Sequence, residues 1–349
     1  MLRDCSAQAL PKLLQEEAVS ALQQIMRVRR ILCPIDLAAG SNEALQYAIT
    51  LSRAYDAKLF IFHCVRTSGL GMIGDEAQQI FAARDAVSRR LTDIFARDHN
   101  PPVLRALHWE PAICLCENPG DAIVSEAAKR NVDLIVMRSR RRPHRAALLG
   151  STAEEVCRTA SCPVLVTHAE EREWVEGSTI QLKRVLVAYD FSDFSEFALN
   201  YALSFAQEYQ AELHLLHVLP PSTVGEPEIS WYPLGQEGAY HTAARRLQRA
   251  VPTEAHLWCN VRHVISEGQP YREILNYAES NQIDLICIGA HGAGFGMRTL
   301  FGSNVDRVLR QAPCPVLVAR PLKPELSAET SPLLHALADT SVGRRAVNS

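Results

Sequence analysis

An internal repeat constrains this chain more than any other feature of its sequence. Five short segments of the first half recur in the same order in the second half, displaced by 151 to 154 residues. The matched segments are 31–36 with 185–190, 59–63 with 213–217, 133–136 with 284–287, 150–151 with 302–303, and 162–166 with 314–318. A spacing of that length is the size of a whole domain and is too long for one unit of a solenoid. The 349-residue chain is therefore predicted to contain two copies of one domain.

The repeat sets the predicted domain boundaries. Repeat 1 is placed at 29–169 and repeat 2 at 182–321, and the polar segment 170–181 between them is interpreted as a linker. Residues 1–28 form an N-terminal extension that contains apolar residues at helical spacing. Residues 322–349 are predicted to be a flexible tail, because they are polar and contain two prolines.

Within each repeat, short apolar runs alternate with helical patterns. The apolar runs of repeat 2 are 185–188, 213–218, 261–266, 285–289 and 316–319. Such continuous runs are typical of strands buried on both faces of a parallel sheet. Between the first two runs, the residues from Asp193 to Glu196 resemble a capping box that opens a helix. The alternation predicts a doubly wound, Rossmann-like α/β fold, in which ligands bind outside the carboxyl ends of the strands.

Composition and charge exclude several classes of protein. Hydrophobic residues make up 47% of the chain, and a net charge of −3 gives no chain-wide basic field for nucleic acid or an anionic membrane. No apolar run reaches the ~18 residues of a membrane span. Charged residues interrupt the N-terminus before a signal-peptide core forms, so we expect a cytoplasmic location.

The ten cysteines are spread thinly, unlike those of a small secreted disulfide scaffold. Cys33, Cys64 and Cys287 lie inside apolar runs, and we interpret most of the cysteines as buried free thiols in a reducing compartment. Cys114 and Cys116 would lie on one face of a strand. A metal site there would need further ligands at suitable spacing, and the sequence around the pair offers none.

Glycines after the fourth apolar run of repeat 2 mark the candidate site. Gly289, Gly292 and the pair Gly302-Ser303 follow the form G-x2-G-x9-G-S. Glycine allows the backbone to approach a ligand closely. Gly302 also precedes a helical pattern, whose first N–H groups favour an anion such as phosphate. Glycines equally close loops without binding anything, so both interpretations stay open.

Polar residues at two strand ends of repeat 2 add to the candidate site. Asp190 ends the first strand, where its carboxylate could accept hydrogen bonds from a ribose or a base, or could cap the following helix. His217 ends the second strand, as His63 does in repeat 1. We interpret both histidines as structural walls of a pocket and not as catalytic bases.

Taken together, these features resemble the universal stress protein family. The resemblance rests on Asp190, the strand end His217-Val218, the glycine motif and the closing Cys-Pro-Val-Leu-Val strand at 314–318. It covers both repeats. It implies a five-stranded parallel sheet in each repeat, association through the last strand, and ATP binding wherever the glycine motif is kept.

The resemblance also implies which residues would bind ATP. Asp190 would contact the nucleoside, and the backbone at Val218 and Ile288 would meet the adenine. The phosphates, shared with Mg²⁺, would be held by Gly289, Gly292, Gly302, Ser303 and Asn304. Val305 stands where the family often has a hydroxyl residue.

The glycine motif is degenerate in repeat 1. Arg138 and Arg141 stand where repeat 2 has its first two glycines, and side chains there are expected to crowd the phosphate cradle. The segment 138–145 carries five arginines, which could bind an anion through their side chains or form a solvated charged loop. Asp36 and the helix-start residues 150–152 remain, while Cys64 replaces Val218. Repeat 1 is therefore not expected to bind ATP in the same manner.

Three classes of function follow from this sequence. The first is a stress-response regulatory protein that binds ATP in repeat 2 and acts as a conformational switch or as an adaptor to an unidentified regulatory protein. The second is a nucleotide-free adaptor or scaffold. The third, an ATP-using enzyme of related fold, is disfavoured because no P-loop and no pairing of base and nucleophile stands out, so we expect at most weak ATPase activity.

The last apolar run of each repeat is expected to join the two repeats as an internal pseudo-dimer. Residues 164–167 and 316–319 are the candidate edge strands. Because an uncovered apolar edge promotes aggregation, pairing the two runs removes that risk. Association of two whole chains as a homodimer is a further expectation that stays open.

Overall fold

The computed structural model describes residues 28–37, 42–66, 76–97, 107–139, 150–168, 174–176, 179–221, 235–291 and 302–321. The tail at 322–349, residues 1–27 of the extension and the arginine segment after Ser139 lie outside these described residues. Within them, no helix combines the length and apolar character that crossing a membrane requires.

One ten-stranded sheet runs through both repeats in the order β10-β9-β8-β11-β12-β5-β4-β1-β2-β3. The strands of repeat 1 are β1 (Arg30–Pro34), β2 (Lys58–Arg66), β3 (Trp109–Cys116), β4 (Leu134–Arg138) and β5 (Val164–Thr167). Those of repeat 2 are β8 (Arg184–Ala188), β9 (Glu212–Leu219), β10 (Val261–Glu267), β11 (Leu285–Gly289) and β12 (Val316–Ala319). Every pairing inside a repeat is parallel, so the predicted five-stranded parallel sheet is confirmed for each.

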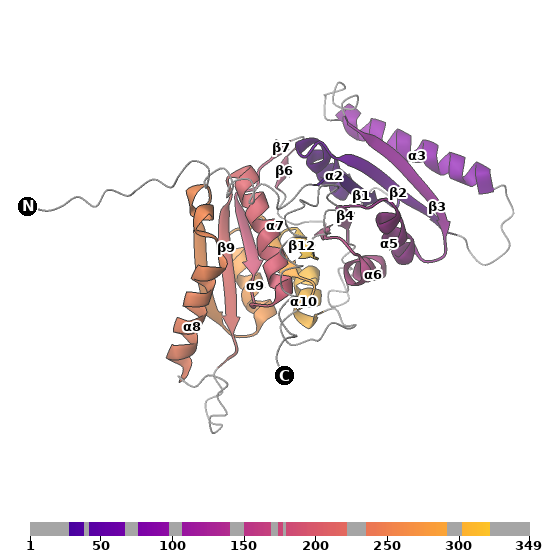
Figure 1. Cartoon of the computed structure of the whole chain (residues 1–349). Helices are drawn as coiled ribbons and strands as arrows, with labels where there is room; N and C mark the ends of the chain where they lie inside the picture. Colours follow the sequence, from indigo (N-terminus) through magenta and orange to yellow (C-terminus); the bar gives the residue numbers. More distant parts are fainter. Residues whose placement is uncertain are drawn as a thin grey trace, which may run out of the picture.

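Helices cover both faces of this sheet (Figure 1). Repeat 1 contributes α2 (Asn42–Ala54), α3 (Glu76–Arg97), α5 (Pro119–Lys129) and α6 (Ser151–Thr159). Repeat 2 contributes α7 (Asp193–Tyr209), α8 (Gly235–Ala250), the short 3-10 helix η2 (Thr253–Leu257), α9 (Pro270–Ser280) and α10 (Ser303–Gln311). In β8, Val185 and Val187 join the core under α7 and α8, whereas Leu186 joins the core under α9 and α10. Because the strands are buried on both faces, their sequences are unbroken apolar runs.

The two repeats meet through their last strands. β12 pairs antiparallel with β5, and Leu317 lies opposite Leu165 in the register. Both side chains are fully buried. The predicted internal pseudo-dimer is therefore confirmed, and the apolar edge of each repeat is covered by the other.

The segment that joins the repeats is also anchored in the core. It forms the hairpin β6 (Val175–Glu176) and β7 (Thr179–Ile180), next to Trp174, which is 1% exposed. The indole packs edge-on against Tyr47 of α2 at 4.8 Å between ring centroids and against Phe205 of α7 at 6.4 Å. The backbone N–H of Trp174 donates to the Tyr47 hydroxyl at 3.1 Å. The segment interpreted as a linker thus contains one aromatic residue that ties it to both repeats.

The start of α7 lies one residue from the predicted capping box. Ser192 is the N-cap, and its hydroxyl accepts a hydrogen bond from the backbone N–H of Ser195 at 3.2 Å. Glu196, expected to reach back to the cap, instead accepts a hydrogen bond from the Tyr189 hydroxyl. Asp193 is the first helical residue, and its negative charge there interacts favourably with the helix dipole.

Candidate functional site

A cleft of about 370 Å³ opens at the carboxyl ends of β8, β9 and β11 in repeat 2. β8 pairs with β9 on one side and with β11 on the other, so the strand order reverses at β8. Such a switch point is where doubly wound sheets bind ligands. The volume lies within the roughly 300–1,000 Å³ usual for small-molecule pockets.

The cleft brings together the predicted site residues that the structure describes. Its lining includes Asp190, Val218, Ile288, Gly289, Gly302, Ser303 and Asn304. Gly292, the other predicted residue, lies outside the described residues. The seven come from four places in the sequence that only the fold makes adjacent: the turn after β8, β9, the end of β11 and the start of α10. Their role in binding stays a prediction.

Asp190 is held by the turn that leads into α7. Its carboxylate accepts hydrogen bonds from both the backbone N–H, at 3.1 Å, and the hydroxyl of Ser192. A bond to the residue two positions on is the pattern of an Asx turn. Asp190 therefore does not cap α7 directly, since Ser192 does so, but it orders the capping residue. Its half-buried carboxylate still lines the cleft.

Phe191, the residue between Asp190 and Ser192, adopts the left-handed backbone conformation. Phe191 has φ of 64°, and Leu37, at the same place in repeat 1, has φ of 58°. Both repeats therefore place a left-handed residue directly after the aspartate that follows the first strand.

The two described glycines of the motif have different reasons to be glycine. A Cβ at Gly289 would lie 2.7 Å from the carbonyl carbon and oxygen of Phe194, so α7 packs directly on this backbone. The close approach we expected from a ligand is thus made by a helix at this position. Gly302 has φ of −59° and ψ of 132°, which any residue can adopt. Among the described residues, a Cβ there would meet the Val305 side chain at 3.4 Å and the carbonyl oxygen of Ala290 at 3.9 Å.

The start of α10 supplies hydrogen-bond donors to the cleft. Gly302 is its N-cap, and no side chain caps the helix there. The first N–H groups of a helix have no partners inside the helix, and its dipole places partial positive charge beside them. Because Ser303 and Asn304 of this first turn line the cleft, its polar end suits an anion.

The opposite wall of the cleft is apolar and was only partly foreseen. Val218 and Ile288 were predicted, whereas Pro270 and Ile274 of α9 were not. The sequence signal that could have identified them is a helix start directly after the third strand of the repeat, with proline in its first turn. The cleft thus combines an apolar wall, one carboxylate and a helix N-terminus.

His217 forms a side of the cleft, and its ring is anchored to the backbone. Its Nδ1 lies 2.8 Å from the carbonyl oxygen of Tyr189, and His63 makes the same contact with Ile35 at 2.8 Å in repeat 1. Burial lowers the pKa of His217, so the ring is neutral at pH 7 and Nδ1–H is the donor. The same anchor in both repeats supports the interpretation of these residues as structural walls.

Histidine burial predicts a stability that falls as the pH is lowered. Burial lowers the pKa of His214, His217 and His263, so the unfolded chain, whose histidines titrate near 6.5, takes up protons first. The contribution of these histidines to the free energy of unfolding should therefore be constant above about pH 6.5 and decrease below it. Urea unfolding at pH 7.5 and pH 5.5 measures this. His217→Asn, which keeps a donor for Tyr189, should show a smaller decrease, and an equal decrease would contradict the contribution of His217.

The counterpart of this cleft in repeat 1 is built differently. Arg138, at the position of Gly289, forms an ion pair with Glu43 of α2 at 3.0 Å. Its side chain therefore contacts the helix that corresponds to α7, and the expectation that side chains at 138 and 141 crowd a phosphate cradle stays a prediction. Arg141 lies outside the described residues.

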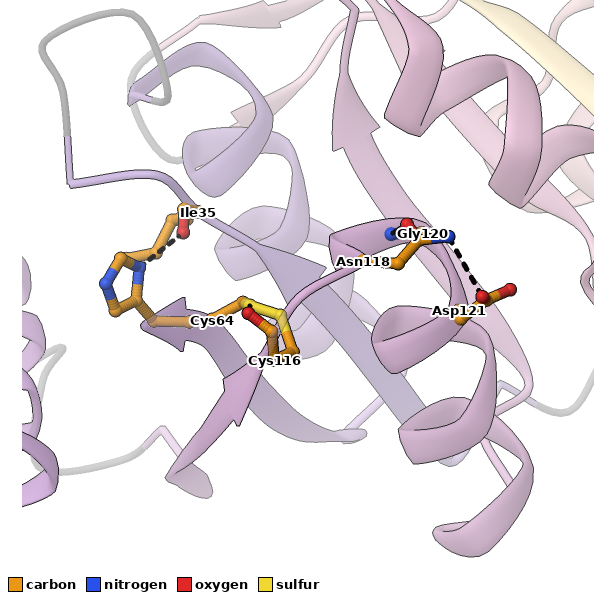
Figure 2. Close-up of a disulfide and its surroundings, with 7 residues drawn as sticks. Ile35, Cys64, Cys116, Asn118, Gly120 and Asp121 are labelled. Carbon is orange, nitrogen blue, oxygen red and sulfur yellow. Dashed lines mark hydrogen bonds between the residues drawn. A yellow bond between two sulfur atoms is a disulfide. The ribbon is translucent and has the colours of Figure 1, made fainter. Parts of the chain in front are cut away.

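Cysteines occupy the other wall of the repeat 1 counterpart. Cys64, at the position of Val218, forms a disulfide with Cys116 (Figure 2). Cys64 is therefore not a free thiol, unlike Cys33 and Cys287, which are free and buried as expected. The sulfurs of Cys64, Cys114 and Cys116 lie within 4.8 Å of one another. The expectation that the Cys114 and Cys116 pair has no further ligand nearby was wrong, because strand pairing brings in Cys64.

Comparison with known proteins identifies the repeats. The profile described as the universal stress protein family matches residues 27–168 and again residues 181–320. The universal stress protein MJ0531 of Methanocaldococcus jannaschii is 31% identical over 144 residues, which are 41% of this chain and 85% of that protein. The universal stress protein Rv2623 of Mycobacterium tuberculosis is 34% identical over 177 residues, which are 50% of this chain and 56% of that protein.

A solved structure shares the whole two-repeat fold. The crystal structure of a universal stress protein from Archaeoglobus fulgidus matches with a TM-score of 0.58 and 22% sequence identity. The match covers 84% of this chain and 99% of that one. At this identity the likeness shows the fold alone.

Proposed function

The chain belongs to the universal stress protein family, and from this premise we propose that it is a regulatory protein that binds one adenine nucleotide, ATP, in the cleft of repeat 2. One observation carries the proposal. Residues predicted from a linear motif, spread from Asp190 to Asn304, line a single cleft of ligand size at the switch point of the sheet. Their convergence is what a nucleotide site on this fold requires.

The cleft fits the parts of ATP in order. The adenine would lie along the apolar wall formed by Val218, Ile274 and Ile288. The ribose hydroxyls would donate to Asp190. The phosphates, with Mg²⁺ neutralising part of their charge, would accept hydrogen bonds from the N–H groups at the start of α10. The room beside Gly302 that a Cβ would otherwise fill suits this close approach.

The proposal is for binding and regulation, with at most slow hydrolysis. The nucleotide would contact both α10 and the turn before α7. These two helices cover opposite faces of the sheet. The nucleotide would stabilise the conformation in which these elements are close, and a partner protein could detect that conformation. The ring of His217 is a weakened general base, because burial lowers its pKa, and with Nδ1–H donating to the Tyr189 carbonyl only Nε2 can accept a proton.

Calorimetric titration of the full chain with MgATP tests this proposal. We expect one nucleotide per chain. Asp190→Asn should weaken binding about tenfold to a hundredfold, because a hydrogen bond to a charged group contributes about 1.5–3 kcal/mol. Asparagine keeps an oxygen for the N–H of Ser192, so the turn should remain.

Asp36→Asn is the matched control in repeat 1 and should leave the affinity unchanged. Two equivalent sites per chain, or loss of binding on changing Asp36 alone, would show that the working repeat is wrongly assigned. Absence of any binding to the unmodified chain would favour the nucleotide-free adaptor.

A further inference from the structure

Three cysteines converge at the carboxyl ends of β2 and β3, on the side of the sheet covered by α5. Cys64 is the register partner of Cys114 across these parallel strands. Cys114 and Cys116 are two residues apart on one strand, so their side chains share a face. Cys64 and Cys116 form a disulfide with a Cα separation of 6.0 Å, within the usual range of about 4.4–6.8 Å. Cys114 is a free thiol, and its sulfur lies within 4.8 Å of both.

The exposure of this trio separates it from the other described cysteines. All three of its members are partly exposed. The remaining cysteines in the described part of the chain are buried: Cys33, Cys157, Cys162, Cys259, Cys287 and Cys314. Burial raises the pKa of Cys259 to about 11 and that of Cys157 to about 12, so these thiols do not form the reactive thiolate near neutral pH. Burial, and after it the charge of Glu126, also raise the pKa of Cys114, so exposure is what distinguishes the trio from the other described cysteines.

The trio stands where repeat 2 has a wall of its cleft. Cys64 occupies the place of Val218, and Ile123 of α5 occupies that of Ile274, which lines the cleft. Cys64 and Cys114 pack against the core cluster that contains Ile123, as Val218 packs against the part that contains Ile274. Figure 2 shows the disulfide beside the start of α5, which Asn118 caps by accepting from the N–H of Gly120 at 3.0 Å. Repeat 1 thus presents sulfur atoms at the position where repeat 2 presents an apolar surface.

We propose that Cys64, Cys114 and Cys116 form a thiol–disulfide exchange site for low-molecular-weight thiols and disulfides of the glutathione class. Repeat 1 is then a redox-responsive module in the same chain as the ligand-binding cleft of repeat 2, at the opposite end of the joined sheet. The inference goes beyond the proposed nucleotide binding and does not depend on it.

Glutathione supplies the electrons that reduce the protein disulfide, and glutathione disulfide accepts them in the reverse direction. In reduction, a glutathione thiolate attacks the sulfur of Cys116, forming a mixed disulfide and releasing Cys64 as a thiolate that takes up a proton. A second glutathione thiolate attacks the glutathione sulfur of that mixed disulfide and releases Cys116. One protein disulfide and two glutathione molecules thus give two protein thiols and one glutathione disulfide, and oxidation is the reverse. Cys114 can accept the bond internally, by attacking Cys64 and releasing Cys116, with no net change in oxidation.

Equilibration of the folded full chain in glutathione buffers tests the proposal. After acid quenching and differential alkylation, peptide mass spectrometry measures the fraction of Cys64 and Cys116 in disulfide form. We expect this fraction to fall from near one to near zero across the range of glutathione ratios, and to recover on reoxidation. The buried cysteines named above are the internal control and should remain unmodified in the native protein throughout. Because the measurement contains no nucleotide, it can fail or succeed independently of ATP binding.

Single variants test the arrangement of the three sulfurs. Cys116→Ser should move the disulfide to Cys64 and Cys114. Cys114→Ser should leave the Cys64–Cys116 equilibrium within a factor of about two, and Cys64→Ser should abolish the intramolecular disulfide.

A bond that stays intact in excess dithiothreitol under native conditions would overturn the proposal in favour of a structural disulfide. Thiols that never pair under glutathione disulfide would also overturn it. So would one equivalent of zinc retained by the reduced chain and lost in Cys114→Ser, because that result would assign a three-thiolate metal site.

Discussion

Gly302→Leu is expected to weaken ATP binding by a hundredfold or more, which corresponds to a loss of at least about 2.7 kcal/mol of binding free energy. The backbone at Gly302, with φ of −59° and ψ of 132°, accommodates leucine without strain. Its Cβ would make ordinary contacts with the described residues Val305 and Ala290. The rest of the side chain would enter the cleft beside the first N–H groups of α10, where the phosphates are proposed to bind. Calorimetry with MgATP measures the loss, and circular dichroism verifies that the fold is kept.

Repeat 1 offers a matched control for this substitution. Gly150 is the N-cap of α6 with φ of −61° and ψ of 136°, nearly the backbone geometry of Gly302, and it also lacks a side-chain cap. Gly150→Leu therefore makes the same chemical change at the equivalent helix start. It should leave ATP affinity unchanged. Equal losses for the two variants would mean that the effect is not specific to the cleft of repeat 2.

Trp174→Ala is expected to lower the free energy of unfolding by about 3–5 kcal/mol, the usual cost of removing a buried large aromatic side chain. Trp174 is 1% exposed and packs between Tyr47 of repeat 1 and Phe205 of repeat 2. Alanine would leave a cavity between the two repeats that their joined sheet cannot readily close, because β5 and β12 fix the spacing of the repeats. Urea unfolding, followed by tryptophan-independent far-ultraviolet circular dichroism, measures the change.

Trp174→Phe is the control for aromatic packing. Phenylalanine keeps a ring between Tyr47 and Phe205, and the backbone N–H that donates to the Tyr47 hydroxyl is unaffected. We expect it to recover more than half of the stability lost in the alanine variant. A change below about 1 kcal/mol for Trp174→Ala would show that the anchor contributes little to joining the repeats.

The sequence by itself determined the fold class and seven of the residues that line the cleft. Duplication was visible because matching segments recur at a near-constant offset, and apolar runs such as 285–289 identify strands that are buried on both faces. The carboxyl ends of parallel strands lie at one sheet edge. For this reason, residues as distant as Asp190 and Gly302 could be assigned to one site from the sequence alone.

Tertiary structure alone decided what each of these residues packs against. Gly289 is glycine because the backbone of α7 occupies the space of its side chain, and Arg138 reaches Glu43 on the corresponding helix. Trp174 looked like part of a polar linker, because a single aromatic residue has no periodicity to reveal its burial. Cys64 and Cys116 are 52 residues apart in sequence, and only the register of β2 with β3 joins them. Local patterns record which face of an element is apolar, whereas the partner on that face is set by contacts between distant segments, which periodicity does not encode.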